Sequence, residues 1–493
     1  MKNLLTKLTP LLPILGIAIT VLVLFFANYK PGTFLTGWDN LHPEFNTALA
    51  LKRSIFAVWQ EYQGLGLLGG MGHAADLIHV VQIWLLSFVF PMNLIRYVWT
   101  FLMIFVGGIG AFYFINYLLN RKSSAKSLEN SNETLSAFLG ALFYILNLAT
   151  LQTFYAPFEA FSAHFAALPW LLLTSINFLH ISNKKSALLL AVTLLLASPH
   201  AYVPTLFVVY LLAMTVYVAV SFFTNESKGQ LIKSSLKLSG IIGLVNSFWL
   251  LPFLYFALTN AATNVTSKIN QMATETIFAQ NKEFGNLQDT ALLKGFWFQN
   301  IDPNLNGDRV FMLSPLKEFY ANPAIMILGF LFFAFVLFGV IKVFLKKEKR
   351  LYPLAFLFIF AFTMLATTTF PFSWIDIAFR KLPLFDQVFR FPYTKFSILA
   401  SLTFSIFVSY SLMAIIYKLR YRLKNASKFI ILALFTVLLV TYASPAFSGN
   451  FFYQKETIKI PKEYFDTFEF FKSQDKTARI ANFPQHTFWG WNF

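Results

Sequence analysis

Long apolar runs constrain this chain more than any other feature of its sequence. A helix needs roughly 20 apolar residues to cross a bilayer core of about 30 Å. Only 12% of the residues are charged and 57% are hydrophobic, whereas soluble domains average about 25% charged residues. Too few polar side chains therefore remain to cover a water-facing surface, and the chain is predicted to be an all-α polytopic membrane protein. Eleven spans are expected, at residues 11–28, 94–119, 135–152, 165–181, 186–199, 203–223, 237–258, 323–345, 351–370, 396–417 and 429–445.

The basic clusters predict the orientation of these spans. With the N-terminus inside, six Lys- and Arg-rich connections all fall on the inner side, as the positive-inside rule requires. These connections hold 19 of the 39 Lys and Arg residues but only four of the 22 acids. The long connections 29–93, 259–322 and 371–395 then face outward, as does everything after residue 445. An odd number of spans places the C-terminus outside.

Charge and cysteine content exclude other classes of protein. The formal net charge of +17 is spread over short clusters between apolar runs, whereas nucleic-acid binding needs one basic soluble face. Nucleic acid is therefore not an expected partner, and the lipid bilayer is. The chain has no Cys, which excludes disulfides, thiolate metal sites and a thiol nucleophile. The first apolar run lacks a small-residue cleavage pattern, so we interpret it as a retained helix.

The first outer connection, 29–93, has the pattern of surface-lying helices. After Pro43, the apolar residues Phe45, Leu49, Ile55, Phe56, Trp59 and Tyr62 form one stripe at helical spacing, which predicts an amphipathic helix in the membrane interface. A glycine-rich stretch, "GLGLLGGMGH", follows and allows a close approach of the backbone to a ligand. The apolar run 77–90 is too short to span and predicts a second surface or re-entrant helix.

The stretch "FLTGWDNLHPEFN" at residues 34–46 carries Asp39, His42 and Glu44 close together. Acids and a histidine in this arrangement suit general acid–base chemistry, and Asp39 with Glu44 could also hold a divalent ion. A solvated loop gives the same pattern, and Asp39 with Asn40 could simply cap the surface helix. The residues alone leave these alternatives open.

The order of elements resembles the GT-C superfamily of membrane glycosyltransferases: one span, an outer loop with surface helices, then a return to a basic inner loop. The segment "ALFYILNLATLQTFYAPFEAFSAHFAALPWLLL" (141–173), with "GGMGHAADLIH" and "FDQVFRFPYTKFSIL", is similar to alpha-(1→3)-arabinofuranosyltransferases and to YfhO-like membrane proteins. Three positions depart from the arabinofuranosyltransferase pattern: Asn147 stands in place of Ser, Ala149 in place of Pro, and His164 in place of Glu.

This resemblance implies a GT-C-like domain over residues 1–445 and transfer of a sugar from a polyprenyl-phosphate donor to a glycan or protein acceptor. It implies the bacterial cytoplasmic membrane as the location, with the active face outside the cell. In this superfamily the acid that begins the first outer loop is the base, and Asp39 holds that position. His42 and Glu44 are then possible assistants, and no cofactor beyond an optional divalent ion is expected.

Further substrate-binding candidates are ionisable residues close to predicted spans and cations of the late outer loop. Asp76 follows the glycine-rich stretch, although a cap for the helix starting at Leu77 is an alternative. Glu159 and His164 lie between predicted spans, where ionisable groups are functional candidates; His200 has a similar setting. The late outer loop contributes four cations that suit a leaving phosphate, or that snorkel at the interface instead: Arg380, Lys381, Arg390 and Lys395.

Residues 446–493 predict the start of an extracytoplasmic domain, and the aromatic ending "FWGWNF" suggests that the sequence continues beyond Phe493. Two functions compete with the glycosyltransferase. One is a transporter or flippase for lipid-linked sugars, and the other is a catalytically inactive scaffold with the same fold.

Overall fold

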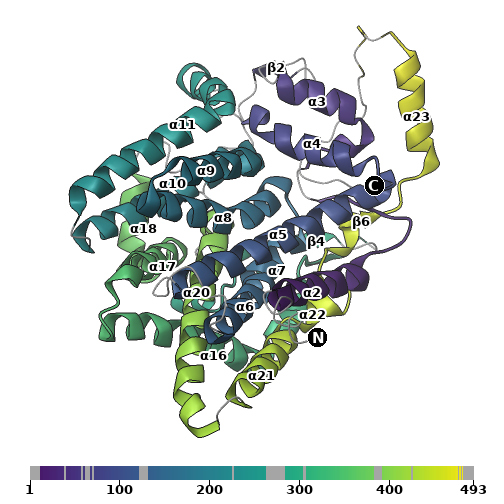
Figure 1. The fold of residues 1–493 in the computed structure, drawn as a ribbon. Coiled ribbons are helices and arrows are strands. Elements are labelled where there is room, and N and C mark those ends of the chain that lie inside the picture. Colours follow the sequence, from purple (N-terminus) through teal and green to yellow (C-terminus); the bar gives the residue numbers. More distant parts are fainter. Residues whose placement is uncertain are drawn as a thin grey trace, which may run out of the picture.

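A computed structural model describes residues 11–37, 40–56, 59–60, 67–68, 72–120, 131–224, 227–262, 284–303, 307–381, 391–423, 426–475, 477–478 and 480. The fold is almost entirely helical (Figure 1). Every one of the eleven expected spans contains helix. The helices at these positions are α2 (Leu12–Asn28), α5 (Met92–Asn120), α6 (Ser131–Leu146) with α7 (Leu148–Tyr155), α8 (Glu159–Ile181), α9 (Lys184–Ala197), α10 (Pro204–Thr224), α11 (Lys228–Thr259), α16 (Pro323–Leu345), α17 (Tyr352–Leu365), α20 (Pro392–Leu423) and α21 (Ala426–Tyr442).

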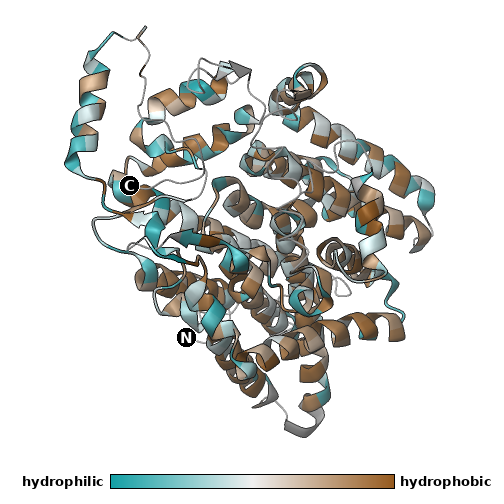
Figure 2. Cartoon of the chain, turned by 180° about the vertical axis from the view of Figure 1, so that it is seen from behind, coloured by the Kyte–Doolittle hydropathy of each residue, from teal (hydrophilic) through white to brown (hydrophobic). Residues whose placement is uncertain are grey.

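Seven of the described helices are long and apolar enough to cross a bilayer, and α6 with α7 makes an eighth if the bent pair is one span. The chain is therefore an all-α membrane protein, and hydrophobic residues dominate its bundle helices in Figure 2. The expected number of eleven spans exceeds this count, because α2, α17 and α21 have only 17, 14 and 17 residues. The expected span 351–370 extends beyond α17, which ends at Leu365.

The centre of the bundle is formed by α5, α8 and α20, whose apolar windows are 67%, 72% and 89% buried. Glycines on α5 allow α8 to approach closely. A Cβ atom at Gly107 would lie 2.5 Å from Phe165, and one at Gly110 would lie 2.6 Å from the Trp170 indole nitrogen. Such close backbone approach through small residues is typical of membrane helix packing, and it fixes the middle of α5 against α8.

The helix pair α6 and α7 is bent by 41° at Asn147. The Asn147 side-chain oxygen accepts a hydrogen bond from the Thr150 backbone N–H at 3.2 Å, which caps the new helix. Its amide donates to Ser401 Oγ of α20 at 2.5 Å. The break is therefore stabilised by a buried side chain and a neighbouring helix, as membrane-depth helix interruptions require.

The first outer connection forms short elements at one end of the bundle (Figure 1). They are β1 (Phe34–Leu35), η2 (Pro43–Phe45), α3 (Thr47–Ile55), β2 (Trp59–Gln60), β3 (Leu67–Leu68), η3 (His73–Asp76) and α4 (Leu77–Leu86). The expected surface helix is shorter than predicted, because it ends at Ile55 and Trp59 pairs with Leu68 in a two-stranded ribbon. Ile55, Phe56 and Trp59 are 55%, 71% and 55% exposed, which fits contact with lipid. Tyr62 and residues 69–71 lie outside the described residues.

The later connections of the bundle also form short elements. They are η4 (Ser198–Tyr202), α14 (Leu287–Ala291), η5 (Phe296–Gln299), β4 (Ile301–Pro303), β5 (Arg309–Phe311), α15 (Ser314–Tyr320), η6 (Lys349–Leu351, within a basic connection) and α18 (Phe372–Arg380).

The segment after α21 returns to the first outer connection. It contains α22 (Ser444–Phe447), η7 (Gln454–Glu456), β6 (Thr457–Ile458) and α23 (Lys462–Ser473). The two residues of β6 pair with β1 in an antiparallel ribbon. The Asn28 side chain joins this segment to α2, because its amide donates to Ala446 O and its oxygen accepts from Phe451 N. Residues 446–458 therefore pack on the membrane bundle, and α23 extends from it in Figure 1, with Phe465 near Phe34 and Phe45.

Candidate functional site

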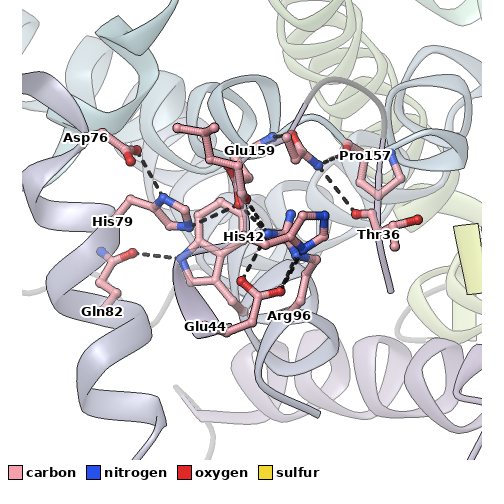
Figure 3. A network of polar contacts seen from close by, with 12 residues as sticks. Thr36, His42, Glu44, Asp76, His79, Gln82, Arg96, Pro157 and Glu159 are labelled. Atoms are coloured by element: carbon pink, nitrogen blue, oxygen red, sulfur yellow. Dashed lines mark hydrogen bonds and ion pairs between the residues drawn. The ribbon is translucent and has the colours of Figure 1, made fainter. Parts of the chain in front are cut away.

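Five elements bring a chain of charged side chains together at this end of the bundle (Figure 3). Glu44 comes from η2, Arg96 from the second turn of α5, and Glu159 from the first position of α8. Asp76 ends η3, and His79 lies in the first turn of α4. We refer to these five residues, with His42 beside them, as the acid network.

Arg96 is the centre of the acid network. Its guanidinium donates to both Glu44 oxygens, from Nε to Oε1 at 3.0 Å and from Nη2 to Oε2 at 3.1 Å. The same Nη2 lies 2.8 Å from Glu159 Oε1 and donates to Leu41 O at 2.6 Å. Such a two-point contact fixes the carboxylate in position as well as in charge. Arg96 thereby joins the first outer loop to α5 and α8.

Arg96 was not among the residues that sequence reasoning selected. It is the only charged residue within α5, and a charged residue inside an apolar span is a functional candidate by default. That signal could have identified it. The pairing of Arg96 with Glu44 and Glu159 could not have been found in this way, because these acids are 52 and 63 positions away along the chain.

His42 lies at the edge of the network nearest solvent and contacts the buried Glu44. His42 Nδ1 lies 3.1 Å from Glu44 Oε1, and the two side chains are 27% and 2% exposed. Burial disfavours the charged form of Glu44, but Arg96 and His42 together hold the pKa of this carboxyl well below its ordinary value. Glu44 is therefore a structural anion in this arrangement, because its lowered pKa makes it a poor proton acceptor.

His79 connects the other two acids. Its Nδ1 lies 3.0 Å from Asp76 Oδ1, and its Nε2 lies 3.7 Å from Glu159 Oε1. Burial alone would lower the pKa of His79, but the carboxylates of Asp76 and Glu159 raise it. The expected capping role of Asp76 is not observed, because its side chain makes no cap hydrogen bond to α4 and contacts His79 instead.

Asn40 ties the first outer loop to the start of α8. Its amide donates to Pro157 O at 2.8 Å, and its oxygen accepts from the Glu159 backbone N–H at 3.1 Å. The surface helix α3 is capped by Asn46. The alternative that Asn40 caps this helix is therefore wrong. Asp39, the proposed base, lies outside the described residues, but both of its described flanking segments are fixed against α8 and the C-terminal segment.

A small cavity of about 10 Å³ lies beside the network. Its lining comes from the first outer loop, α5 and the start of α8: Thr36, Asn40, Arg96, Trp99, Thr100, Pro157, Glu159 and Ser162. The Trp99 indole nitrogen donates to Gln82 Oε1 at 2.8 Å, which fixes the ring. Among the described residues, neither Ser162 Oγ nor Arg96 Nη1 has a hydrogen-bond partner, although both atoms are buried.

Glu456 of η7 lies next to this cavity, and sequence reasoning missed it. Its backbone oxygen accepts from the Thr36 N–H at 2.7 Å. The side chain is 5% exposed, and its two oxygens have no partner among the described residues. Burial raises the pKa of Glu456 well above its ordinary value; Arg96 opposes this shift and Asp302 adds to it. Burial therefore favours the neutral form of this carboxyl group.

The remaining candidates lie apart from the acid network or outside the described residues. His164 faces His200, with their Nδ1 atoms 3.0 Å apart inside the bundle. Lys395 Nζ lies 4.8 Å from the centre of the Phe161 ring, and Lys381 is exposed after α18. The Arg380 side chain and the whole of Arg390 are outside the described part of the chain.

A metal site at Glu44 gains no support from this geometry. Both oxygens of Glu44 are held by Arg96 and His42, and a divalent ion would meet the positive guanidinium. Within the described ranges, no group of three acids or histidines has a metal-binding arrangement.

Comparison with known protein families finds no family model that matches this sequence. Comparison with curated proteins finds no match either.

Proposed function

We propose that this protein is a membrane glycosyltransferase of the GT-C type. It moves a sugar from a polyprenyl-phosphate donor to a hydroxyl group of an envelope glycan or glycoprotein, on the extracytoplasmic face of a bacterial cytoplasmic membrane. The observation that supports this most is the buried acid network, which holds the segment after Asp39 through Glu44 and lies beside a small cavity.

The proposed orientation supports the same function. An inner N-terminus puts the acid network, the cavity and the long connections on the outer side, where lipid-linked sugars are used. The strongly basic short connections then all face inward. The structure has α3 and α4 packed together at the network end, which suits surface helices that hold a site at the level of the lipid headgroups.

In the proposed reaction, Asp39 accepts the proton of the acceptor hydroxyl. The acceptor oxygen forms a bond to the anomeric carbon of the sugar, and the bond from that carbon to the carrier phosphate breaks. The polyprenyl phosphate leaves with the electron pair. Cations of the late outer loop, Arg380, Lys381 and Arg390, stabilise this phosphate through charge-assisted hydrogen bonds. Glu44 and Arg96 position the base, because they hold the loop and remain charged.

The test uses the full chain in lipid nanodiscs with labelled polyprenyl-phosphate pentoses and hexoses and a glycan acceptor. Loss of a positioned base lowers the rate by about 10²- to 10⁴-fold, so Asp39→Asn should reduce transfer by that factor while the protein still inserts. The matched control is Glu318→Gln, a change at an exposed acid on α15, and it should transfer at the parent rate. Transfer by Asp39→Asn at the parent rate would rule out Asp39 as the base.

One observation favours a second function, transport of the lipid-linked sugar across the bilayer. Interrupted spans such as α6 and α7 are common at the binding sites of transporters. A proteoliposome assay with a fluorescent polyprenyl-phosphate sugar distinguishes the two functions. Translocation without glycoside product would favour the transporter, and neither activity, together with normal folding, would favour the inactive scaffold.

A further inference from the structure

A cluster of three lysines lies at the end of the bundle opposite the acid network. Helix α20 begins beside α8, where Lys395 Nζ is 4.8 Å from the centre of the Phe161 ring. Lys418 follows 23 positions later on the same helix, which is about 35 Å away at 1.5 Å per residue. Lys342 and Lys346 come from the end of α16. In Figure 1, α20 ends at the lower edge of the bundle, whereas α3 and α4 lie at its upper edge.

The positive charges of this cluster are not balanced by acids. Lys346 and Lys418 lie close enough to Lys342 for their charges to repel its ammonium group. None of the three lysines forms an ion pair with an acid in the described part of the chain. Glu348 offsets part of the repulsion, but its carboxylate already accepts a hydrogen bond from Tyr410 Oη at 2.7 Å. An anion beside the ends of α16 and α20 would therefore be bound favourably.

An exposed apolar stripe of α16 leads to the same cluster. Its residues recur at spacings of three, four and seven, which places them on one side of the helix. They are Ile327, Leu331, Phe338, Ile341 and Leu345, with exposed fractions of 66%, 42%, 44%, 54% and 77%. Lys342 Nζ lies 5.2 Å from the centre of the Phe338 ring, so its stem covers the last turns of the stripe. A ligand with an anionic head group and long apolar chains matches both features.

We propose that Lys342, Lys346 and Lys418 bind the phosphate of an anionic phospholipid, whose acyl chains lie along the exposed stripe of α16. The lysine ammonium groups donate charge-assisted hydrogen bonds to the phosphate oxygens. Basic pockets between spanning helices on the cytoplasmic side bind head groups of this kind, and the proposed orientation places this end inside. The site is separate from the acid network and does not depend on the proposed glycosyltransferase function.

The test measures lipid binding to the full chain in a neutral detergent by native mass spectrometry. The probes are dioleoyl phosphatidylglycerol, which is anionic, and dioleoyl phosphatidylcholine, which has the same chains but no net charge. The parent should bind the first phosphatidylglycerol more tightly than phosphatidylcholine. One lysine beside anionic lipid contributes about a factor of five in affinity. The double variant Lys342→Gln/Lys418→Gln should therefore weaken phosphatidylglycerol binding by about 25-fold.

The double variant Lys184→Gln/Lys185→Gln is the matched control. It removes the same charge from two exposed lysines at the start of α9, which lie in another basic connection of the predicted inner side. Its affinity for phosphatidylglycerol should equal that of the parent. Phosphatidylcholine should bind equally to the parent and to both double variants, which shows that the variants are folded. Lys342→Arg keeps the charge and should retain phosphatidylglycerol binding.

Inorganic phosphate and glycerol 3-phosphate distinguish a lipid from a soluble phosphate. Neither should displace phosphatidylglycerol when added in excess, because both lack the acyl chains that contact α16. The proposal is overturned if either of them displaces the lipid or if the parent binds the two phospholipids equally. It is also overturned if the two double variants weaken phosphatidylglycerol binding to the same extent, since the effect would then be one of overall charge.

Discussion

Replacement of Arg96 by methionine tests whether the acid network is a true electrostatic unit. The variant removes both hydrogen bonds to Glu44 and the contact with Glu159, and the aliphatic part of the side chain is retained. Glu44 is then left 2% exposed without its principal cation. Removal of one partner from a buried ion pair typically costs about 3 to 5 kcal/mol. We expect Arg96→Met to lower the free energy of unfolding by that amount at pH 7.

The loss should depend on pH in a defined direction. In the parent, the pKa of Glu44 lies below its unfolded value of about 4.3, so its stabilising effect is complete above that pH. The effect is lost only as the pH falls through the lower folded pKa. Without Arg96, burial raises the pKa of Glu44 above the unfolded value. The free energy of unfolding of the variant is therefore lowered only at pH values at which Glu44 must ionise. The difference between parent and variant should therefore shrink as the pH falls from 7 toward 4.

Steric-trap unfolding in bicelles measures these free energies. The control is Lys472→Met, which breaks the Lys472–Glu469 pair on α23, where the side chains are 57% and 70% exposed. Exposed pairs contribute about 0 to 1 kcal/mol, so this control should change little. Adding Glu44→Gln to Arg96→Met should recover stability relative to the sum of the single changes, by about 0.5 to 3 kcal/mol. A loss below about 1 kcal/mol for Arg96→Met, or a loss that grows at low pH, would refute the reasoning.

Three further predictions concern neighbouring residues. Gln82→Leu removes the acceptor of the Trp99 indole N–H, and Trp99 is only 2% exposed. This change should lower the free energy of unfolding by about 1 to 3 kcal/mol, whereas Gln82→Glu should retain stability. Burial lowers the pKa of His73 to about 4 despite the opposing charge of Asp76. Stability should thus fall by up to about 3 kcal/mol as the pH drops from 6.5 to 4, and His73→Gln should remove this loss. Asn28→Leu leaves Ala446 O and Phe451 N unpaired and should speed hydrogen exchange over residues 446–458; an unchanged exchange rate would show that this segment is held by other contacts.

Part of the site was predictable from local sequence. His42 and Glu44 were selected as possible assistants of Asp39, Asp76 because it follows the glycine-rich stretch, and Glu159 because ionisable groups between membrane spans are functional candidates. The structure brings these four together around Arg96. His164 was selected for the same reason, but it lies on a part of α8 that faces His200. The position of a residue in the sequence could not show whether it meets Arg96 or, like His164, another group. That outcome depends on the direction in which each side chain leaves the backbone.

The sequence by itself determined the class of this protein. Apolar runs of spanning length must become helices in a bilayer, since no water is present there to satisfy free backbone groups. Only the tertiary structure decided which residues form the site. Arg96 meets acids 52 and 63 positions away, and Glu456 reaches Thr36 across 420 positions through the pairing of β1 with β6. These contacts depend on how helices pack and how distant segments return to them, and that information is not contained in any single apolar run.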